Sequence, residues 1–161
     1  MHFKRNLKLR TGTHAHLFTG HFNRLPIPRQ EQVLAALHGN FQKHRGSANS
    51  ISMKAFRLLE EAHASIGPKG KTTNFPELIK GLEVADRDCA AISAKFDAEC
   101  KRAEKYFSVF NPKRPGASFS DILGDPMLSQ AHLALKSIDF AKQQIDGARI
   151  FITAIQNRRK K

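Results

Sequence analysis

The sequence predicts an all-α protein: an antiparallel hairpin of two long helices, joined as an alanine-rich coiled coil, with one or two shorter helices packed on it. Two stretches of similar length, 75–110 and 126–158, carry small and aliphatic residues at alternating three- and four-residue spacing. Both stretches open with residues that favour helix starts, and almost no segment shows the alternation typical of strands. The expected architecture is a three- to four-helix bundle.

Residues 1–48 are predicted to form a basic N-terminal segment, partly flexible because its first half shows no sustained period. A short helix is expected near 28–44, since Pro26 and Pro28 suit a first helical turn, where the missing N–H would have no helical partner. Its apolar residues at helical spacing are Val33, Leu34, Leu37 and Phe41.

A linker is expected at residues 46–50, where Gly, Ser, Ala and Asn follow one another. It would separate the N-terminal segment from a helical bundle domain at 49–161. The next helix, near 50–66, is predicted to begin at an Asn or Ser cap and to stop at Gly67 and Pro68. One face of this helix carries Met53, Phe56, Leu59 and Ile66.

The first long helix is predicted to start near Asn74, with Glu77 completing a capping box, and to end at Asn111 and Pro112. Its seam has one charged break, Glu99. A parallel dimer coil would place Glu99 near its symmetry mate, so the antiparallel hairpin within one chain is favoured. The seam comprises Leu78, Leu82, Ala85, Cys89, Ile92, Phe96, Glu99, Ala103, Tyr106 and Phe110.

The second long helix is predicted to start at Asp125 and Pro126, an acidic N-cap followed by proline at the first helical position. Its seam has no polar break, and its alanines allow close approach of a neighbouring helix. Apolar residues beside the seam, including Phe140 and Phe151, widen the face and predict a second neighbour, the helix near 50–66. The seam comprises Met127, Ala131, Ala134, Ile138, Ala141, Ile145, Ala148, Ile152 and Ile155.

Charge is the strongest global feature, since 27 Lys and Arg residues against 14 Asp and Glu residues give a net charge of +13. Glu31 is the only acid in residues 1–50, which hold eight of the basic residues. An excess of this kind predicts an anionic partner. We therefore expect a non-catalytic basic binding module that contacts nucleic acid or, failing that, an acidic protein surface. The contacting residues are expected to be Lys4, Arg5, Lys8, Arg10, Arg24, Arg29, Lys43, Arg45, Arg158, Arg159, Lys160 and Lys161.

The alternative is a protein–protein interaction module, such as an adaptor or a secreted bacterial effector. An acid-poor first segment ahead of a compact helical unit is a layout that translocated proteins often have. The wide apolar face of the last helix could also accept a partner helix. The same face allows oligomers of the chain.

A metal-dependent enzyme is a third hypothesis, because His14, His16 and His21 offer imidazole ligands in close succession. No acid precedes Glu31 and no cysteine precedes Cys89, so further ligands would have to come from another histidine or from far along the chain. Residues 67–73 resemble the end of a phosphate-binding loop but lack its first glycine. We expect no catalytic set, no resident metal and no cofactor.

The two cysteines, Cys89 and Cys100, fall on the same predicted helix and would lie about 16 Å apart along its axis. A disulfide needs Cα atoms within about 7 Å, so these two cannot bond to each other. This favours free or buried thiols in an intracellular, reducing compartment. No run approaches the ~18 apolar residues of a membrane span, and we expect neither a transmembrane segment nor a classical signal peptide.

Overall fold

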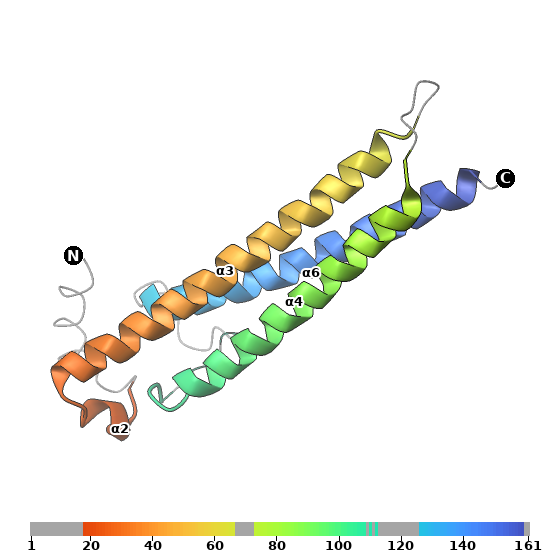
Figure 1. The fold of residues 1–161 in the computed structure, drawn as a ribbon. Helices are drawn as coiled ribbons and strands as arrows, with labels where there is room; N and C mark the ends of the chain where they lie inside the picture. Colours follow the sequence, from red (N-terminus) through yellow and green to blue (C-terminus); the bar gives the residue numbers. More distant parts are fainter. Residues whose placement is uncertain (1–17, 67–72, 109, 111, 113–125, 160–161) are drawn as a thin grey trace. The chain divides into compact units, whose positions relative to one another are not determined.

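The computed structural model describes residues 18–66, 73–108, 110, 112 and 126–159. The all-α class is confirmed for this part of the chain. Its described residues form no β-strand, and their single β-type contact is an isolated bridge between Phe18 and Phe107. None of the described helices has an apolar stretch of the length that a membrane crossing needs. Figure 1 shows the helices α2 (Gly20–Asn23), α3 (Ile27–His63), α4 (Phe75–Ala103) and α6 (Pro126–Arg159).

Helix α3 is continuous from Ile27 to His63, so the predicted linker at 46–50 and the two separate short helices are wrong. Glycine inside a helix costs about 1 kcal/mol relative to alanine, which is too little to break a helix that is held by packing. Phe41 and Ala48, which flank Gly46, are both fully buried. The hydroxyl of Ser50 donates to the Gly46 carbonyl at 3.1 Å and so follows the helical backbone instead of interrupting it. Whether residues 1–48 fold apart from 49–161 stays a prediction.

Helix α4 starts where it was expected, with the Glu77 N–H donating to the side-chain oxygen of Asn74 at 3.5 Å. It ends at Ala103, however, so the predicted end at Asn111 and Pro112 is wrong. After Ala103 the chain turns, with the Phe107 N–H still donating to the Ala103 carbonyl at 3.0 Å. The Tyr106 carbonyl then accepts the Thr19 N–H at 2.9 Å, so this stretch pairs with residues near the N-terminus.

The predicted seam of α6 is confirmed wherever side chains are described. Its alanines lie at 0–1% exposure, and its isoleucines are likewise buried. The side chain of the first seam residue, Met127, lies outside the described residues. The buried seam residues are Ala131, Ala134, Ile138, Ala141, Ile145, Ala148, Ile152 and Ile155.

Contacts divide the chain into two compact units. The first unit contains residues 1–44 and 95–135, and the second unit contains residues 45–94 and 136–161. In the first unit, aromatic rings fill the space between α3 and the end of α4, with Phe41 and Phe96 edge-to-face at 5.6 Å between centroids. Beside them, the amide of Asn40 donates to the Glu99 carboxylate at 3.1 Å, which explains how a charged residue sits on the seam.

The N-terminal part of the first unit differs from the expected irregular segment, because residues 20–23 form the short helix α2. The side chain of Thr19 caps this helix by accepting the Phe22 N–H at 3.2 Å. Gln30 is 95% buried and its amide nitrogen donates to the carbonyls of Leu25 and Phe22, at 2.9 and 3.1 Å. These bonds hold the corner between α2 and α3.

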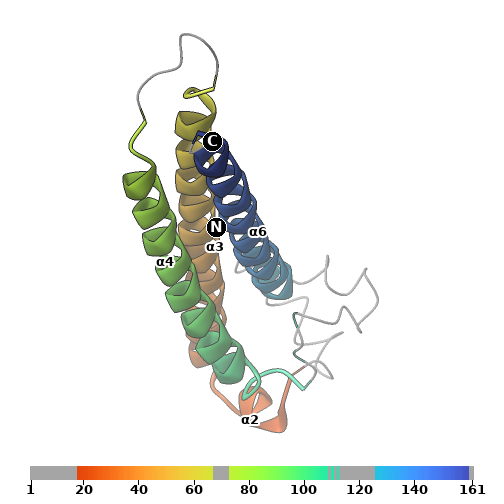
Figure 2. The ribbon, with the colours of Figure 1, turned by 90° about the vertical axis from the view of Figure 1, so that its right-hand side faces the viewer.

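In the second unit, α4 and α6 run antiparallel, as the hairpin prediction requires (Figures 1 and 2). The thiol of Cys89 donates to the Ile138 carbonyl across this pair, at 3.9 Å. Helices α3 and α6 run in the same direction, and the ring of His63 stacks on Phe151 with centroids 6.0 Å apart. Both predicted neighbours of α6 are therefore present.

Candidate functional site

An apolar groove lies between α3 and α6 in the second unit and has a volume of about 650 Å³. Its walls come from the end of α3 and from the stretch of α6 beside it, so two helices that are continuous through this region shape it. A cavity of this size is in the range of binding sites for small ligands and for side chains of a partner. The lining residues are Phe56, Leu59, Glu60, His63, Ala64, Gln143, Gln144, Gly147, Ala148 and Phe151.

The groove exists because α3 places large apolar residues outside its core face. The buried face of this stretch of α3 consists of the small or branched residues Ala48, Ile51, Ser52, Ala55 and Ala62. Phe56 and Met53 lie on the adjoining face and are 43% and 53% exposed. On α6, Phe140 is 52% exposed and precedes the lining residue Gln144 by one helical turn. Large apolar side chains so exposed on adjoining helix faces mark a surface that can bury them against a partner.

The face of Met53, Phe56, Leu59 and Ile66, noted in the sequence, is therefore not the core face of its helix. Leu59 is half-buried and the other three are exposed. The actual core face is offset from it by about one residue, or 100° around a helix of 3.6 residues per turn.

Gly147 keeps the groove open on the α6 side. Apart from the adjoining residues and backbone of its own helix, a Cβ atom added to this glycine would meet no described atom within 4 Å. Among the residues that the structure describes, no close packing therefore requires a glycine at this position of α6. A larger side chain at this position would project into the groove.

The polar groups of the groove are few and carry no positive charge from lysine or arginine. Glu60 is its one carboxylate, His63 is stacked on Phe151, and Gln143 and Gln144 contribute neutral amides. For a chain of net charge +13, a lining without Lys or Arg is distinctive. The lining also contains no serine, threonine or cysteine, the usual nucleophiles.

The predicted basic contact residues do not line this groove. In the first unit, Arg24, Arg29 and Lys43 are exposed, and the Arg29 guanidinium donates to the Gln32 side chain at 3.1 Å. In the second unit, Arg45 is half-buried and lies at the start of the part of α3 that belongs to this unit. Arg158 is exposed and lies near the end of α6. The others fall outside the described side chains: Lys4, Arg5, Lys8, Arg10, Arg159, Lys160 and Lys161.

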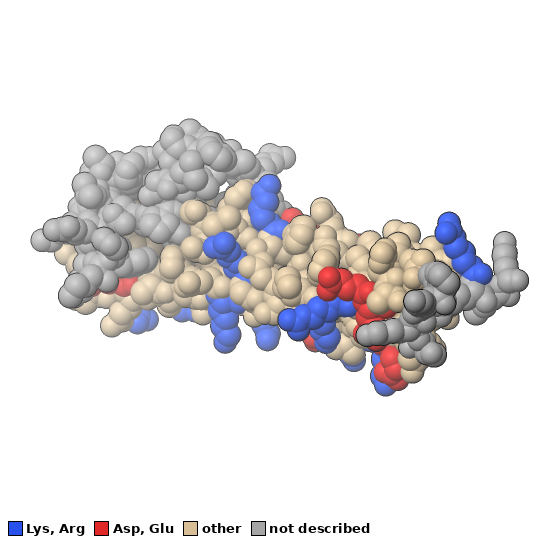
Figure 3. Space-filling model, turned by 90° about the horizontal axis from the view of Figure 1, so that it is seen from above, with Lys and Arg blue, Asp and Glu red and all other residues tan. Residues whose placement is uncertain are grey.

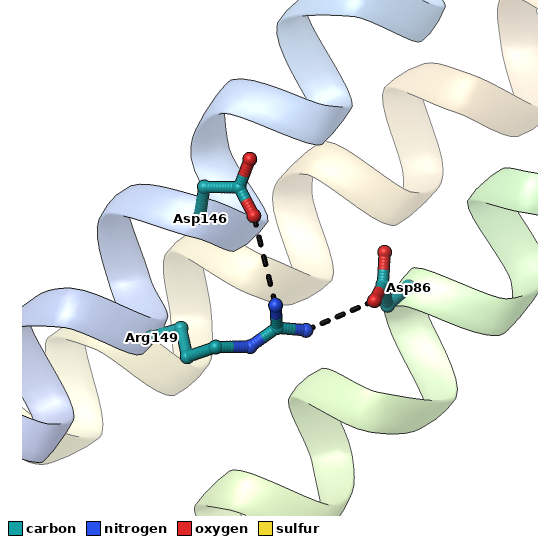
Figure 4. A network of polar contacts seen from close by, with 3 residues as sticks. All are labelled: Asp86, Asp146 and Arg149. Carbon is teal, nitrogen blue, oxygen red and sulfur yellow. Dashed lines mark hydrogen bonds and ion pairs between the residues drawn. The ribbon is translucent and has the colours of Figure 1, made fainter.

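On the face drawn in Figure 3, the Lys and Arg side chains stand apart from one another among uncharged residues, and acidic side chains lie beside some of them. A cluster of acidic and basic side chains links α4 and α6 in the second unit (Figure 4). There the Arg149 guanidinium contacts Asp86 at 3.0 Å and Asp146 at 3.7 Å. All three side chains are 43–68% exposed, so solvent screens these ion pairs.

The histidine cluster is only partly described, because His14 and His16 lie outside the described residues. His21 is exposed and stacks on Tyr106 with ring centroids 6.1 Å apart. Among the residues that the structure describes, no group of three or more His, Cys, Asp or Glu side chains could hold a metal ion. The metal hypothesis therefore gains no support from the described chain.

Both cysteines are buried thiols that form no disulfide, as expected from their positions on one helix. Burial raises the pKa of the Cys89 thiol above its ordinary value of 9.0. In the first unit, burial lowers the pKa of His44 below 6.5, and the neighbouring charge of Glu99 opposes this shift without cancelling it. Neither group lines the groove.

Comparison of the chain with models of known protein families, with curated proteins and with solved structures finds no match. The groove is therefore the feature on which a functional proposal rests. Both components of the groove are visible in the sequence, as the face around Phe56 and the extra width of the α6 face at Phe140 and Phe151. The sequence pattern does not indicate that they form one exposed surface.

Proposed function

We propose that this chain is a non-catalytic helical interaction module, and that its groove between α3 and α6 binds a helix of a partner protein. The observation that carries the proposal is the exposure of Phe56, Met53 and Phe140 beside a groove whose floor is left open at Gly147. Helices that lay an apolar face into a groove between two other helices are a recurrent mode of protein recognition.

The chemistry of the lining supports binding in preference to reaction. Aromatic and aliphatic carbon dominates the walls, and the amides of Gln143 and Gln144 can orient a bound chain. Burial of apolar surface would supply most of the binding free energy, at about 25 cal/mol for each Å² removed from water. Exposed aromatic residues such as Phe56 are the kind that anchor protein interfaces.

The test uses a synthetic amphipathic peptide helix, fluorescently labelled, with leucines at three- and four-residue spacing. We expect Phe56→Asp to weaken its binding at least tenfold, because a charged group would face the apolar stripe. The matched control is Ile150→Asp: Ile150 is 73% exposed on α6 and does not line the groove. Fluorescence anisotropy measures the affinities, and circular dichroism checks that both variants keep their helices. Equal weakening by both variants would contradict the proposal.

A second candidate function is contact with single-stranded nucleic acid by the first unit. The specific observation is the exposed His21 ring stacked on Tyr106, with exposed Arg24 and Lys105 on the same two segments. The Thr19 hydroxyl donates to the Lys105 carbonyl at 2.8 Å and so joins these segments. Aromatic rings among basic side chains suit base stacking and phosphate contact.

Labelled single-stranded DNA tests this candidate. We expect affinity to fall steeply as salt rises, because each neutralised phosphate releases a counterion. Arg24→Ala should reduce the slope of that salt dependence, whereas Phe56→Asp should leave it unchanged. Absence of binding at low salt would rule the candidate out.

A further inference from the structure

We infer that the occupant of the groove is an amphipathic helix of three turns from another protein, with a large apolar side chain over Gly147 and a lysine or arginine opposite Glu60. This inference rests on the proposed function and adds the length, the shape and the charge pattern of the partner.

The length follows from the positions of the lining residues. Phe56 to His63 spans about 10 Å along α3, and Gln143 to Phe151 spans about 12 Å along α6, or two helical turns. Exposed Phe140 extends the groove face of α6 by one more turn. Exposed Met53, three residues before the lining residue Phe56, extends the groove face of α3 in the same way. An elongated apolar surface of three turns suits a helix, whose diameter of about 10–12 Å matches the space beside two packed helices.

The shape follows from Gly147. It lies between Gln144 and Phe151 on the groove face of α6, and no atom lies within 4 Å of where its Cβ would be. Position 147 is therefore an exposed, open place in the lining with larger side chains, Gln144 and Phe151, on the same face, and it can accept a protruding side chain as in knobs-into-holes packing. A leucine, methionine or phenylalanine of the occupant would fill it.

The charge pattern follows from Glu60. It is the one carboxylate in the lining, which contains no lysine or arginine to neutralise it. Partial desolvation by an apolar occupant would leave this carboxylate short of water unless the occupant supplies a cation. A lysine or arginine beside the apolar stripe meets that need, whereas an acidic residue there would be repelled.

The same features disfavour the other occupants. Nucleic acid would find no lysine or arginine in the lining, and its phosphates would be repelled by Glu60. A second copy of this chain would bring the same surface to the groove, with Glu60 and no lysine or arginine among its lining residues, so it offers no cation for Glu60. It would also bring together two chains of net charge +13.

The experiment compares two labelled synthetic peptides with the same leucine stripe, one with lysines and one with glutamates flanking it. The full chain is titrated with each peptide, and fluorescence anisotropy gives the affinities. The variants are Glu60→Gln, Gly147→Leu and, as the matched control, Gly46→Leu. Gly46 is also a glycine within a helix that has open space at its Cβ position, and it does not line the groove.

We expect the lysine peptide to bind about two- to fivefold more tightly than the glutamate peptide, the effect of one exposed ion pair. Glu60→Gln should abolish that preference, Gly147→Leu should reduce binding of both peptides at least tenfold, and Gly46→Leu should change neither. Light scattering of the free chain at increasing concentration tests the second copy as occupant.

Any other outcome contradicts a particular part of the inference. If both peptides bind equally and Gly147→Leu still blocks them, the charge pattern is wrong and the proposed function stands. If neither peptide binds the unmodified chain, the proposed function fails together with this inference. A dimer that forms with concentration and is lost in Gly147→Leu would make a second copy the occupant and overturn the inference.

Discussion

The glycines within the helices give the sharpest test of the packing. Gly147 in α6 has open space where a Cβ would lie, so Gly147→Ala should gain helix propensity without any new contact. Gly81 in α4 differs, because its Cβ would lie 3.1 Å from both methyl carbons of Leu58 on α3. That distance is tighter than most real contacts, so Leu58 must move to admit a methyl group.

The magnitudes follow from these two environments. Gly147→Ala should raise the free energy of unfolding by about 0.5–1 kcal/mol, the usual difference between glycine and alanine inside a helix. In a chain of this size, a change of that magnitude raises the melting temperature by roughly 1–4 °C. For Gly81→Ala the same gain is offset by overpacking, which typically costs about 1–3 kcal/mol, so the net effect should be zero or destabilising.

Thermal and urea unfolding followed by circular dichroism measure both variants under the same conditions. Gly46→Ala, at another helical glycine with open space, serves as a second stabilising control. An equal gain for Gly81→Ala and Gly147→Ala would refute the close approach of α3 and α4. A loss for Gly147→Ala would refute the open floor of the groove.

Three other predictions concern single side chains. Because burial lowers the pKa of His44 in the folded state, the contribution of its neutral form to stability should be complete above pH 6.5 and should be lost as the pH falls below 6.5. In His44→Gln, the free energy of unfolding measured in urea should depend less on pH in that range. Cys89 is 1% exposed and burial raises its pKa, so maleimide should modify it much more slowly in the folded chain than in urea. Mass spectrometry measures the two rates, and equal rates would contradict the burial of Cys89. A double-mutant cycle with Asp86→Ala and Arg149→Ala should give a coupling of about 0.2–1 kcal/mol that fades at high salt, because this pair is solvent-exposed; a coupling that persists in high salt would contradict that.

The long helices were predictable because their patterns are long and unambiguous. Eight consecutive seam positions of α6, from Ala131 to Ile155, repeat at three- and four-residue spacing without a polar break, and all eight are buried. Over that length, a period is a stronger signal than any single residue. The start of α4 at Asn74 could also be read locally, because a cap depends on side chains only a few residues away.

The continuity of α3 could not be read from local residues. Gly46, Ser47 and Asn49 have low helix propensities, and the stretch reads as a linker. Burial of Phe41, Ala48 and Ile51 on one face overrides those preferences, and that burial depends on helices distant in the sequence. The early end of α4 could not be read locally either, because the stretch after Ala103 contacts a distant part of the chain, where the Thr19 N–H donates to the Tyr106 carbonyl.

The groove was missed for a related reason. A stripe such as Met53 and Phe56 looks like a core face, and only the number of neighbours around α3 decides whether it is buried. Alanines, which signal close packing in α6, also form the buried face of α3 at Ala48 and Ala55. In α3, the face that carries alanines packs against the other helices, whereas the neighbouring face that carries Phe56 stays open to a partner.

The central claim is that the groove between α3 and α6 is a surface for a partner helix, and a nitrogen–proton NMR titration tests it most directly. The lysine-flanked leucine peptide is added to the labelled chain, and the Gly147 amide, together with those of Phe56 and Phe151, reports on the groove. We predict that the largest shift changes fall on these amides. Shift changes concentrated around His21 and Arg24, or none at saturating peptide, would contradict the account.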